Sequence, residues 1–209
     1  KFTDDSNGTG TMLSTGGAVA VTCSESSEKG SEIQVSNSEI KKNRSHGSGG
    51  ALAILTMGAG KDFIDGVNFE ENCTINESEN SMIYGGAVHT SGGTLVKVSG
   101  NSHFLNNTVS GYTGGNRGGG GALSILTAQN AVIEDVTFEG NTAAATGGAL
   151  FVDATQNNIE GKAQVTRCNF HNNTAKNAGG GAYFLSLEGM IDIASSLFTE
   201  NVAQGVTPD

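Results

Sequence analysis

Carboxylates are the side chains of this sequence best suited to catalysis or metal binding. Asp62 and Asp65 lie close together in the chain, and Glu134 is followed directly by Asp135. Two carboxylates that reach one substrate can act as acid and base in glycoside hydrolysis, and clustered carboxylates can hold calcium. Whether these residues act together depends on the elements that position them.

Other groups that could bind metal do not form a recognisable pattern. Acidic stretches such as Glu70-Glu71 and 77–79 offer oxygen ligands, but the Gly-Gly-x-Gly-x-Asp repeat of calcium β-rolls is absent, so we interpret them as solvated surface. The histidines fall in separate parts of the chain, and we interpret them as exposed or loop residues that form no metal site: His46, His89, His103 and His171.

The three cysteines, Cys23, Cys73 and Cys168, fit no zinc spacing and no disulfide framework. We predict that Cys168 is a reduced core residue. A bond between Cys23 and Cys73 is an open alternative that we do not favour.

Composition excludes several classes of function. The chain of 209 residues carries a net charge of -10, whereas nucleic acids and anionic membranes attract clustered Lys and Arg. No apolar run approaches the roughly 18 residues of a spanning helix, so we expect no direct membrane insertion. The chain opens at Lys1 with no signal peptide, which leads us to expect a fragment of a longer protein. No cofactor is indicated.

A pair of short motifs recurs along the whole chain. A Gly-Gly-Ala triplet occurs six times: Gly16-Gly17-Ala18, Gly49-Gly50-Ala51, Gly85-Gly86-Ala87, Gly120-Gly121-Ala122, Gly147-Gly148-Ala149 and Gly180-Gly181-Ala182. A Phe-x-x-Asn motif follows each of the last five: Phe69/Asn72, Phe104/Asn107, Phe138/Asn141, Phe170/Asn173 and Phe198/Asn201. The first repeat has Ile40 and Asn43 instead. Constant order over six repeats is typical of a solenoid.

Alternating apolar residues divide each repeat into three predicted strands. Leu123 and Ile125 follow a triplet, and similar pairs such as Ala163 and Val165 precede the Phe. The last strand of each repeat ends on the Phe itself. Period-two alternation indicates a strand with one buried face. We therefore predict an all-β, right-handed parallel β-helix of about six coils, each with three short strands, forming a single segment over residues 1–209.

Stacking of coils places equivalent residues over one another. The five Phe residues are then expected to be buried as an aromatic ladder, and the Asn residues to form an amide ladder at a turn. Gly pairs suit a turn that needs positive φ or close backbone approach. A β-sandwich would not repeat both motifs in constant order, and a propeller blade is longer than the 27-residue spacing from Gly120 to Gly147.

The same register predicts contacts between charged residues on the outer surface. Lys41 and Lys42 are expected over Glu70 and Glu71. Asp135 is likewise expected beside Arg167.

The carboxylates can now be placed on the coils. Asp65 and Glu134 share a column, but one coil separates them and puts their backbones about 10 Å apart. We interpret both of them, with Asp62 and Asp135, as bend carboxylates that face solvent.

Alternating Gly-Gly-Ala-(Ile/Leu/Val) and Phe-x-x-Asn motifs over residues 2–201 resemble the chlamydial polymorphic outer-membrane proteins. The chain departs from that pattern at Ile40, at Tyr183 after the last triplet, and in lacking a signal sequence and a barrel. The resemblance implies an autotransporter passenger on the bacterial cell surface or outer membrane. It also implies adhesion to host epithelial cells through a receptor protein, and assembly into homo-oligomers.

Candidate binding residues lie in insertions and at outward positions. The insertion 108–119 contains Tyr112 and Arg117, and Phe151 and Phe184 are expected to share an outward position one coil apart. A covering loop at 154–161 is the favoured alternative for that aromatic pair. The rival function is a carbohydrate-active β-helix enzyme, which requires a groove lined by clustered charged residues.

Overall fold

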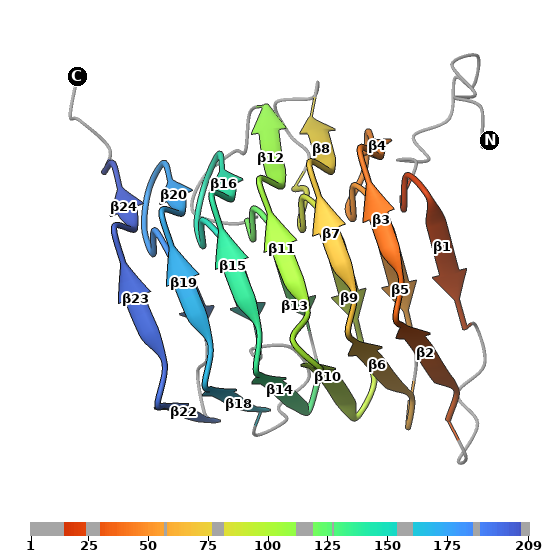
Figure 1. The fold of residues 1–209 in the computed structure, drawn as a ribbon. Helices are drawn as coiled ribbons and strands as arrows, with labels where there is room; N and C mark the ends of the chain where they lie inside the picture. Colours follow the sequence, from red (N-terminus) through yellow and green to blue (C-terminus); the bar gives the residue numbers. More distant parts are fainter. Residues whose placement is uncertain are drawn as a thin grey trace.

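The computed structural model describes residues 15–23, 30–56, 58–76, 82–111, 119–126, 128–153, 161–185 and 189–205. Within these ranges the chain forms only short β-strands, which stack as four six-stranded sheets (Figure 1). Every strand pairs in parallel with its equivalents in the neighbouring coils, as in the pairing of Phe104 with Phe69 and Phe138. The molecule is therefore a parallel β-helix, as the repeat predicts.

Sheets A and B follow each Gly-Gly pair. Sheet A consists of β1 (Val19–Thr22), β5 (Leu52–Leu55), β9 (Val88–Ser91), β13 (Leu123–Leu126), β17 (Leu150–Asp153) and β21 (Ala182–Leu185). Sheet B consists of β2 (Glu32–Ser36), β6 (Lys61–Asp65), β10 (Leu95–Ser99), β14 (Asn130–Glu134), β18 (Gly161–Thr166) and β22 (Gly189–Ala194). Burial alternates along strands such as β6 and β14, so one face of sheet B meets the core and the other meets solvent.

Sheet C carries the Phe column, and sheet D follows the Asn column. Sheet C consists of β3 (Glu39–Lys41), β7 (Asn68–Glu70), β11 (His103–Leu105), β15 (Thr137–Glu139), β19 (Asn169–His171) and β23 (Leu197–Thr199). Sheet D consists of β4 (Arg44–Ser45), β8 (Cys73–Asn76), β12 (Thr108–Gly111), β16 (Thr142–Ala143), β20 (Thr174–Ala175) and β24 (Val202–Ala203). The expected three strands per coil are thus four. Strands such as β16 are too short to give a period-two signal.

The bends between sheets B and C place non-glycine residues in the left-handed region. Asp135 and Arg167 have φ of 54° and 53°, and Gly66 occupies the equivalent bend of an earlier coil with φ of 64°. This conformation costs an L-residue roughly 1–2 kcal/mol, and Asn and Gly reduce that cost. Residues with positive φ therefore mark the sharp bends between sheets B and C.

Candidate functional site

The two glycines of each triplet are required for different reasons. Gly120 adopts φ of 71°, which favours glycine, whereas Gly121 makes a close approach between coils. A Cβ on Gly121 would lie 2.0 Å from the Gly148 carbonyl oxygen and 2.6 Å from the backbone of Thr142. The absence of a side chain at Gly121 therefore allows its backbone to pack closely against β16 of sheet D and against Gly148 in the next coil.

The last triplet is displaced by one residue from the expected alignment. Gly179 has the positive φ of 65°, and Gly180 approaches the Val202 backbone. Gly181 occupies the position of Ala149, since the amide of Ala149 donates to the Gly181 carbonyl at 3.0 Å. The structural unit is thus Gly179-Gly180-Gly181, and Gly181 is not the second glycine of the pair. Three consecutive glycines allowed two alignments in the sequence.

The Phe residues form one continuous stack through the core. Neighbouring ring centroids lie 4.9 Å apart for both Phe69–Phe104 and Phe104–Phe138, 4.7 Å apart for Phe138–Phe170 and 4.4 Å apart for Phe170–Phe198. The first four are fully buried, but Phe198 is 41% exposed because no described coil follows it. The expectation that all five are buried is therefore wrong for Phe198.

The Asn ladder satisfies both side-chain and backbone groups. The Asn107 amide nitrogen and its Nδ2 both donate to Asn141 Oδ1, at 2.9 and 3.1 Å. Asn107 Nδ2 also donates to the Phe69 carbonyl, at 2.9 Å. The same three contacts recur for Asn72, Asn141 and Asn173 with their neighbours. Because these groups are buried, each ladder step replaces hydrogen bonds to water that folding removes.

Asn201 departs from this pattern because it is the last member of the ladder. Its Oδ1 accepts from the Asn173 amide nitrogen and Nδ2, at 3.0 and 2.8 Å, and its own Nδ2 donates to the Phe170 carbonyl at 2.7 Å. No described coil follows, so Asn201 has no next Asn to which it can donate, and it is only half-buried. Asn201 therefore takes part in the predicted amide ladder as its end member among the described coils, as Phe198 does in the aromatic stack.

Phe151 and Phe184 do not form an exposed pair. Phe151 pairs in register with Tyr183, whereas Phe184 pairs with Val152 and packs against the core. The error follows from the one-residue displacement of the last triplet. Phe151 points outward but is 1% exposed.

Phe151 belongs to an aromatic row on the outer face of sheet A. Its ring is stacked on Tyr183 at 5.9 Å and contacts Tyr84 at 5.6 Å. Tyr84 in turn stacks on His89 at 5.7 Å. The alternation in the sequence identified the outward position of Phe151. It gave no signal that Tyr84 would reach Phe151 across the intervening coil, in which the residue equivalent to Tyr84 is Gly119.

His89 is buried beside this row and has a hydrogen-bond partner. It is 6% exposed, and its Nδ1 lies 2.8 Å from Ser124 Oγ. Burial lowers the pKa of His89 to about 4. The ring is therefore neutral at physiological pH, and the expectation of an exposed or loop histidine is wrong here.

Tyr112 and Arg117 lie outside the described residues. Among the binding residues expected from the sequence, only Phe151 and Phe184 are therefore located.

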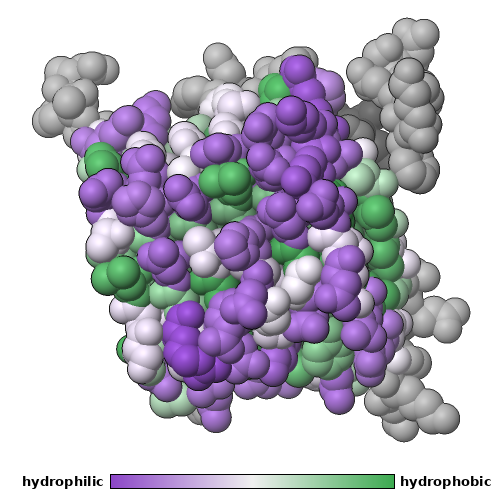
Figure 2. Space-filling model, viewed as in Figure 1, coloured by the Kyte–Doolittle hydropathy of each residue, from purple (hydrophilic) through white to green (hydrophobic). Residues whose placement is uncertain are grey.

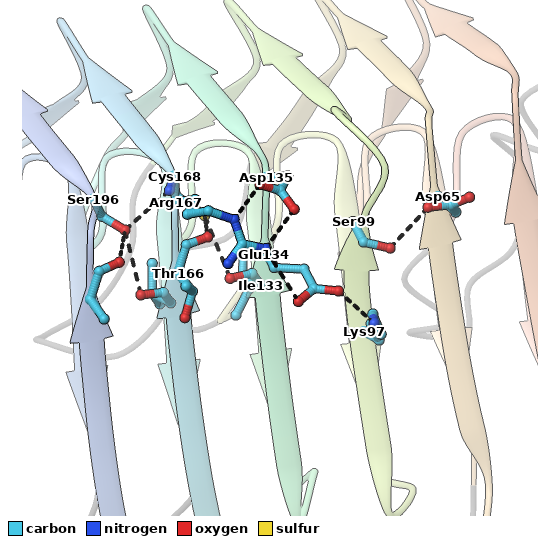
Figure 3. Close-up of polar contacts among 12 residues, drawn as sticks. Asp65, Lys97, Ser99, Ile133, Glu134, Asp135, Thr166, Arg167, Cys168 and Ser196 are labelled. Carbon is cyan, nitrogen blue, oxygen red and sulfur yellow. Dashed lines mark hydrogen bonds and ion pairs between the residues drawn. The ribbon is translucent and has the colours of Figure 1, made fainter.

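The carboxylates at the end of sheet B form hydrogen bonds and ion pairs with residues of neighbouring coils (Figure 3). Asp65 accepts a hydrogen bond from Ser99 Oγ at 2.9 Å, and Ser99 separates it from Glu134 in the column, as predicted. Glu134 forms an ion pair with Lys97 and lies 3.8 Å from Arg167. Because Asp65 and Glu134 belong to coils that are not adjacent and Glu134 is paired with bases, the two do not form an acid–base pair.

Asp135 and Arg167 form a bidentate pair on adjacent coils. Arg167 Nε and Nη2 donate to the two carboxylate oxygens at 2.7 and 2.8 Å. This hydrogen bonding lowers the pKa of the Asp135 carboxyl. The predicted pairs Lys41–Glu70 and Lys42–Glu71 are also confirmed, at 2.9 and 3.6 Å. The charged surface thus follows the coil register.

Asp62 contradicts the expectation of a solvent-facing bend carboxylate. It lies within β6 and is 1% exposed, in the inward column between Ile33 and Val96. Burial raises the pKa of its carboxyl to about 6, although a hydrogen bond from Thr56 acts in the opposite direction. The sequence did carry the signal, since Asp62 alternates with the buried Ile64.

All three cysteines are free, and Cys168 is buried. Among the described residues no group of three or more His, Cys, Asp or Glu side chains is arranged to hold a metal ion. The part of the chain that the structure describes also contains no helix with the length and apolarity of a membrane span. The features that recur from coil to coil are the Phe and Asn ladders, the close backbone contacts at the Gly pairs, and the rows of side chains on the outer faces of the sheets.

Fold and ladders together define a repeat-built parallel β-helix in which every coil contributes one Phe, or Ile40, and one Asn to a shared core. The sequence model of the Chlamydia polymorphic membrane protein repeat matches residues 135–153, which contain Phe138-x-x-Asn141 and Gly147-Gly148-Ala149. Over these residues the chain is therefore similar to the Chlamydia polymorphic membrane proteins, and the same two motifs recur in its other coils. No curated protein and no solved structure matches the chain.

Proposed function

We propose that this chain is a segment of an autotransporter passenger domain that lies at the outer membrane or cell surface and binds a host-cell receptor protein. The observation that carries the proposal is the division between a uniform interior and a varied exterior. The Phe and Asn ladders repeat through the coils, whereas outward positions change from one coil to the next. A stiff scaffold with variable surface groups suits recognition by many contacts.

The longest connections lie at the ends of sheet A. The chain leaves β8 at Asn76 and enters β9 at Val88, and it leaves β12 at Gly111 and enters β13 at Leu123. Between sheets B and C, by contrast, β14 ends at Glu134 and β15 begins at Thr137. Receptor contacts are therefore proposed at the sheet A side, with Tyr112 and Arg117 as the first residues to test.

Sheet C lies on the side of the molecule that faces the reader in Figure 1. In Figure 2 hydrophilic side chains dominate the view in which sheet C faces the reader, and apolar side chains are scattered among them. Isolated apolar residues are common on protein surfaces and need no partner. This side provides the matched control surface.

Beads coated with the segment should bind human epithelial cells, and free segment should compete. Replacing 112–118 by a Gly/Ser linker of equal length should reduce binding without changing the circular dichroism spectrum. His103→Ala, at an exposed position on sheet C, should leave binding unchanged. Folded segment that leaves beads unbound contradicts the adhesin proposal. Turnover of an acidic polysaccharide by the same preparation would favour the enzyme instead.

Self-association is proposed through the last coil. Ile191 and Ile193 occupy inward columns yet are 44% and 47% exposed, and Phe198 ends the aromatic stack. Covering such residues with a coil of a second copy would bury apolar area and extend the sheets. Stacked copies would multiply weak receptor contacts.

Sedimentation measured over a range of concentrations tests this interface. Ile191→Glu with Ile193→Glu should abolish assembly, while Met190→Glu on the outer face of the same strand should retain it. A segment that remains monomeric at all concentrations contradicts the proposal for this surface.

A further inference from the structure

A carboxyl group stands in the apolar core of the second coil. The inward column of sheet B reads Ile33, Asp62, Val96 and Ala131 from coil to coil. Asp62 is 1% exposed, so its side chain takes a position that its neighbours fill with apolar groups. Burial without full hydrogen bonding is costly for a carboxyl and most costly for its charged form.

Hydrogen bonding at Asp62 is incomplete. Its Oδ2 has one long contact, 3.5 Å from Thr56 Oγ1, and its Oδ1 has no partner among the described residues. Thr90, on the adjacent coil of sheet A, is fully buried and its Oγ1 also has no partner there. Unpartnered buried oxygens of this kind are rare in native proteins and require an explanation.

Among the described residues, those that pack against Asp62 provide no counter-charge. Strands β2 and β10 flank β6 and present Ile33 and Val96 to Asp62, and Thr56 contacts it from the junction with sheet A. The junction is tight, since a Cβ on Gly60 would lie 2.8 Å from Thr56 Cβ. The charged residues of the three strands alternate onto the outer face of sheet B: Glu32, Lys61, Asp65 and Lys97.

We infer that Asp62 makes the second coil sensitive to pH, so that β6 is held firmly between β2 and β10 when the carboxyl is protonated and is loosened when it ionises. A neutral carboxyl can remain among apolar groups, whereas a carboxylate needs water or a cation. Because Asp62 is 1% exposed and its Oδ1 has no partner among the described residues, an ionised Asp62 gains hydration when this part of the coil opens. The inference does not depend on the adhesin proposal.

The sign follows from the direction of the pKa change. The folded pKa of about 6 is above the ordinary value of 3.8, so the folded state holds the proton more tightly than the unfolded state. The stabilising effect of the proton is complete below about pH 4 and is lost as pH rises through about 6. The folding equilibrium constant should change across this interval by up to about a hundredfold.

Denaturant unfolding of wild type and Asp62→Asn, measured from pH 4 to pH 8, tests the inference. The folding constant of wild type divided by that of Asp62→Asn should fall as pH rises, because only the wild type carries the titrating group. All other groups, His89 included, cancel in this ratio. Gln34→Ala, at an exposed position on the neighbouring strand β2, removes no titrating group and should keep a constant ratio to wild type over the same interval.

Two further measurements locate the effect. Hydrogen exchange, corrected for its intrinsic pH dependence, should show loss of protection in β2, β6 and β10 above pH 6 in wild type but not in Asp62→Asn or Asp62→Val. If neither variant folds, carbon NMR titration of the Asp62 carboxyl in wild type decides the matter. An Asp62 that titrates near 4, or a wild-type to Asp62→Asn ratio independent of pH, overturns the inference.

Discussion

Phe138 and Phe170 stack in the core with ring centroids 4.7 Å apart and ring planes at 12°. Their backbones pair directly across sheet C. The spacing of the rings therefore matches the spacing of strands in a sheet, about 4.8 Å, and each ring fills one coil of the interior. This match links a backbone repeat to a side-chain repeat, and it makes the central Phe positions the most sensitive in the chain.

Phe138→Ala is expected to lower the free energy of unfolding by about 3–5 kcal/mol, because apolar burial is lost and a cavity remains between two rings. Phe198→Ala is the matched control. That ring contacts only one neighbour in the ladder and is 41% exposed, so its removal should cost clearly less. Urea unfolding followed by circular dichroism measures both. Equal losses for the two variants would contradict the ladder.

Gly121→Ala is expected to prevent folding or to reduce stability severely. The new methyl group would meet backbone atoms of the next coil, at 2.0 Å from the Gly148 carbonyl oxygen and 2.6 Å from Thr142 in β16. Backbone atoms cannot yield as a flexible side chain would. Gly66→Ala offers a comparison, since its nearest atom is a side-chain oxygen of Asn37 at 3.1 Å, and mainly the cost of positive φ remains. Thermal melts should rank Gly121→Ala below Gly66→Ala.

The repeat was sufficient to predict the fold because stacked coils impose one register on every column. The Phe and Asn columns and the pair Lys41–Glu70 all follow from aligning the motifs. The predicted register was wrong where the motif itself was ambiguous, as in Gly179-Gly180-Gly181. Phe184 was therefore assigned to the column of Phe151, whereas it pairs with Val152.

Local burial was harder to predict than register. Asp62 was assigned to the surface by its residue type, although alternation with Ile64 placed it inside. Asn201 has the same motif as the buried Asn residues, and only its place in the last coil leaves it half-buried. The cover over Phe151 comes from Tyr84, which is distant in sequence, so no local pattern could reveal it.

Cys168 should behave as a protected thiol in the native protein. It is buried, its Sγ lies 3.5 Å from the Ile133 carbonyl oxygen, and burial raises its pKa, which suppresses the reactive thiolate. Titration with a thiol reagent should find three free thiols after unfolding without reductant, while native Cys168 reacts far more slowly than Cys23. Fewer than three thiols in the unfolded chain would indicate a disulfide. Cys168→Ser should fold, since Ser102 occupies the same column and its Oγ accepts from the Val67 amide at 3.1 Å.

His89 should make the protein less stable in mild acid. Its folded pKa of about 4 lies below the ordinary value of 6.5, so the unfolded chain takes up the proton first as pH falls. The stability from the neutral ring is present above about pH 6.5 and is lost progressively towards pH 4, by up to about 3 kcal/mol. His89→Gln keeps a group that can bond Ser124 Oγ, and it removes the titration.

Comparison of unfolding free energies of wild type and His89→Gln between pH 4 and pH 7 isolates this effect, because the contribution of Asp62 is common to both. Wild type should lose stability relative to the variant as the solution is acidified. His103→Gln, at an exposed position on sheet C, should show no such trend. Asp62 and His89 act in opposite directions over the same interval, so the wild-type profile should be flatter than that of either Asp62→Asn or His89→Gln. Parallel pH profiles for wild type and His89→Gln would show that the ring is hydrated in solution and does not occupy the buried site beside Tyr84.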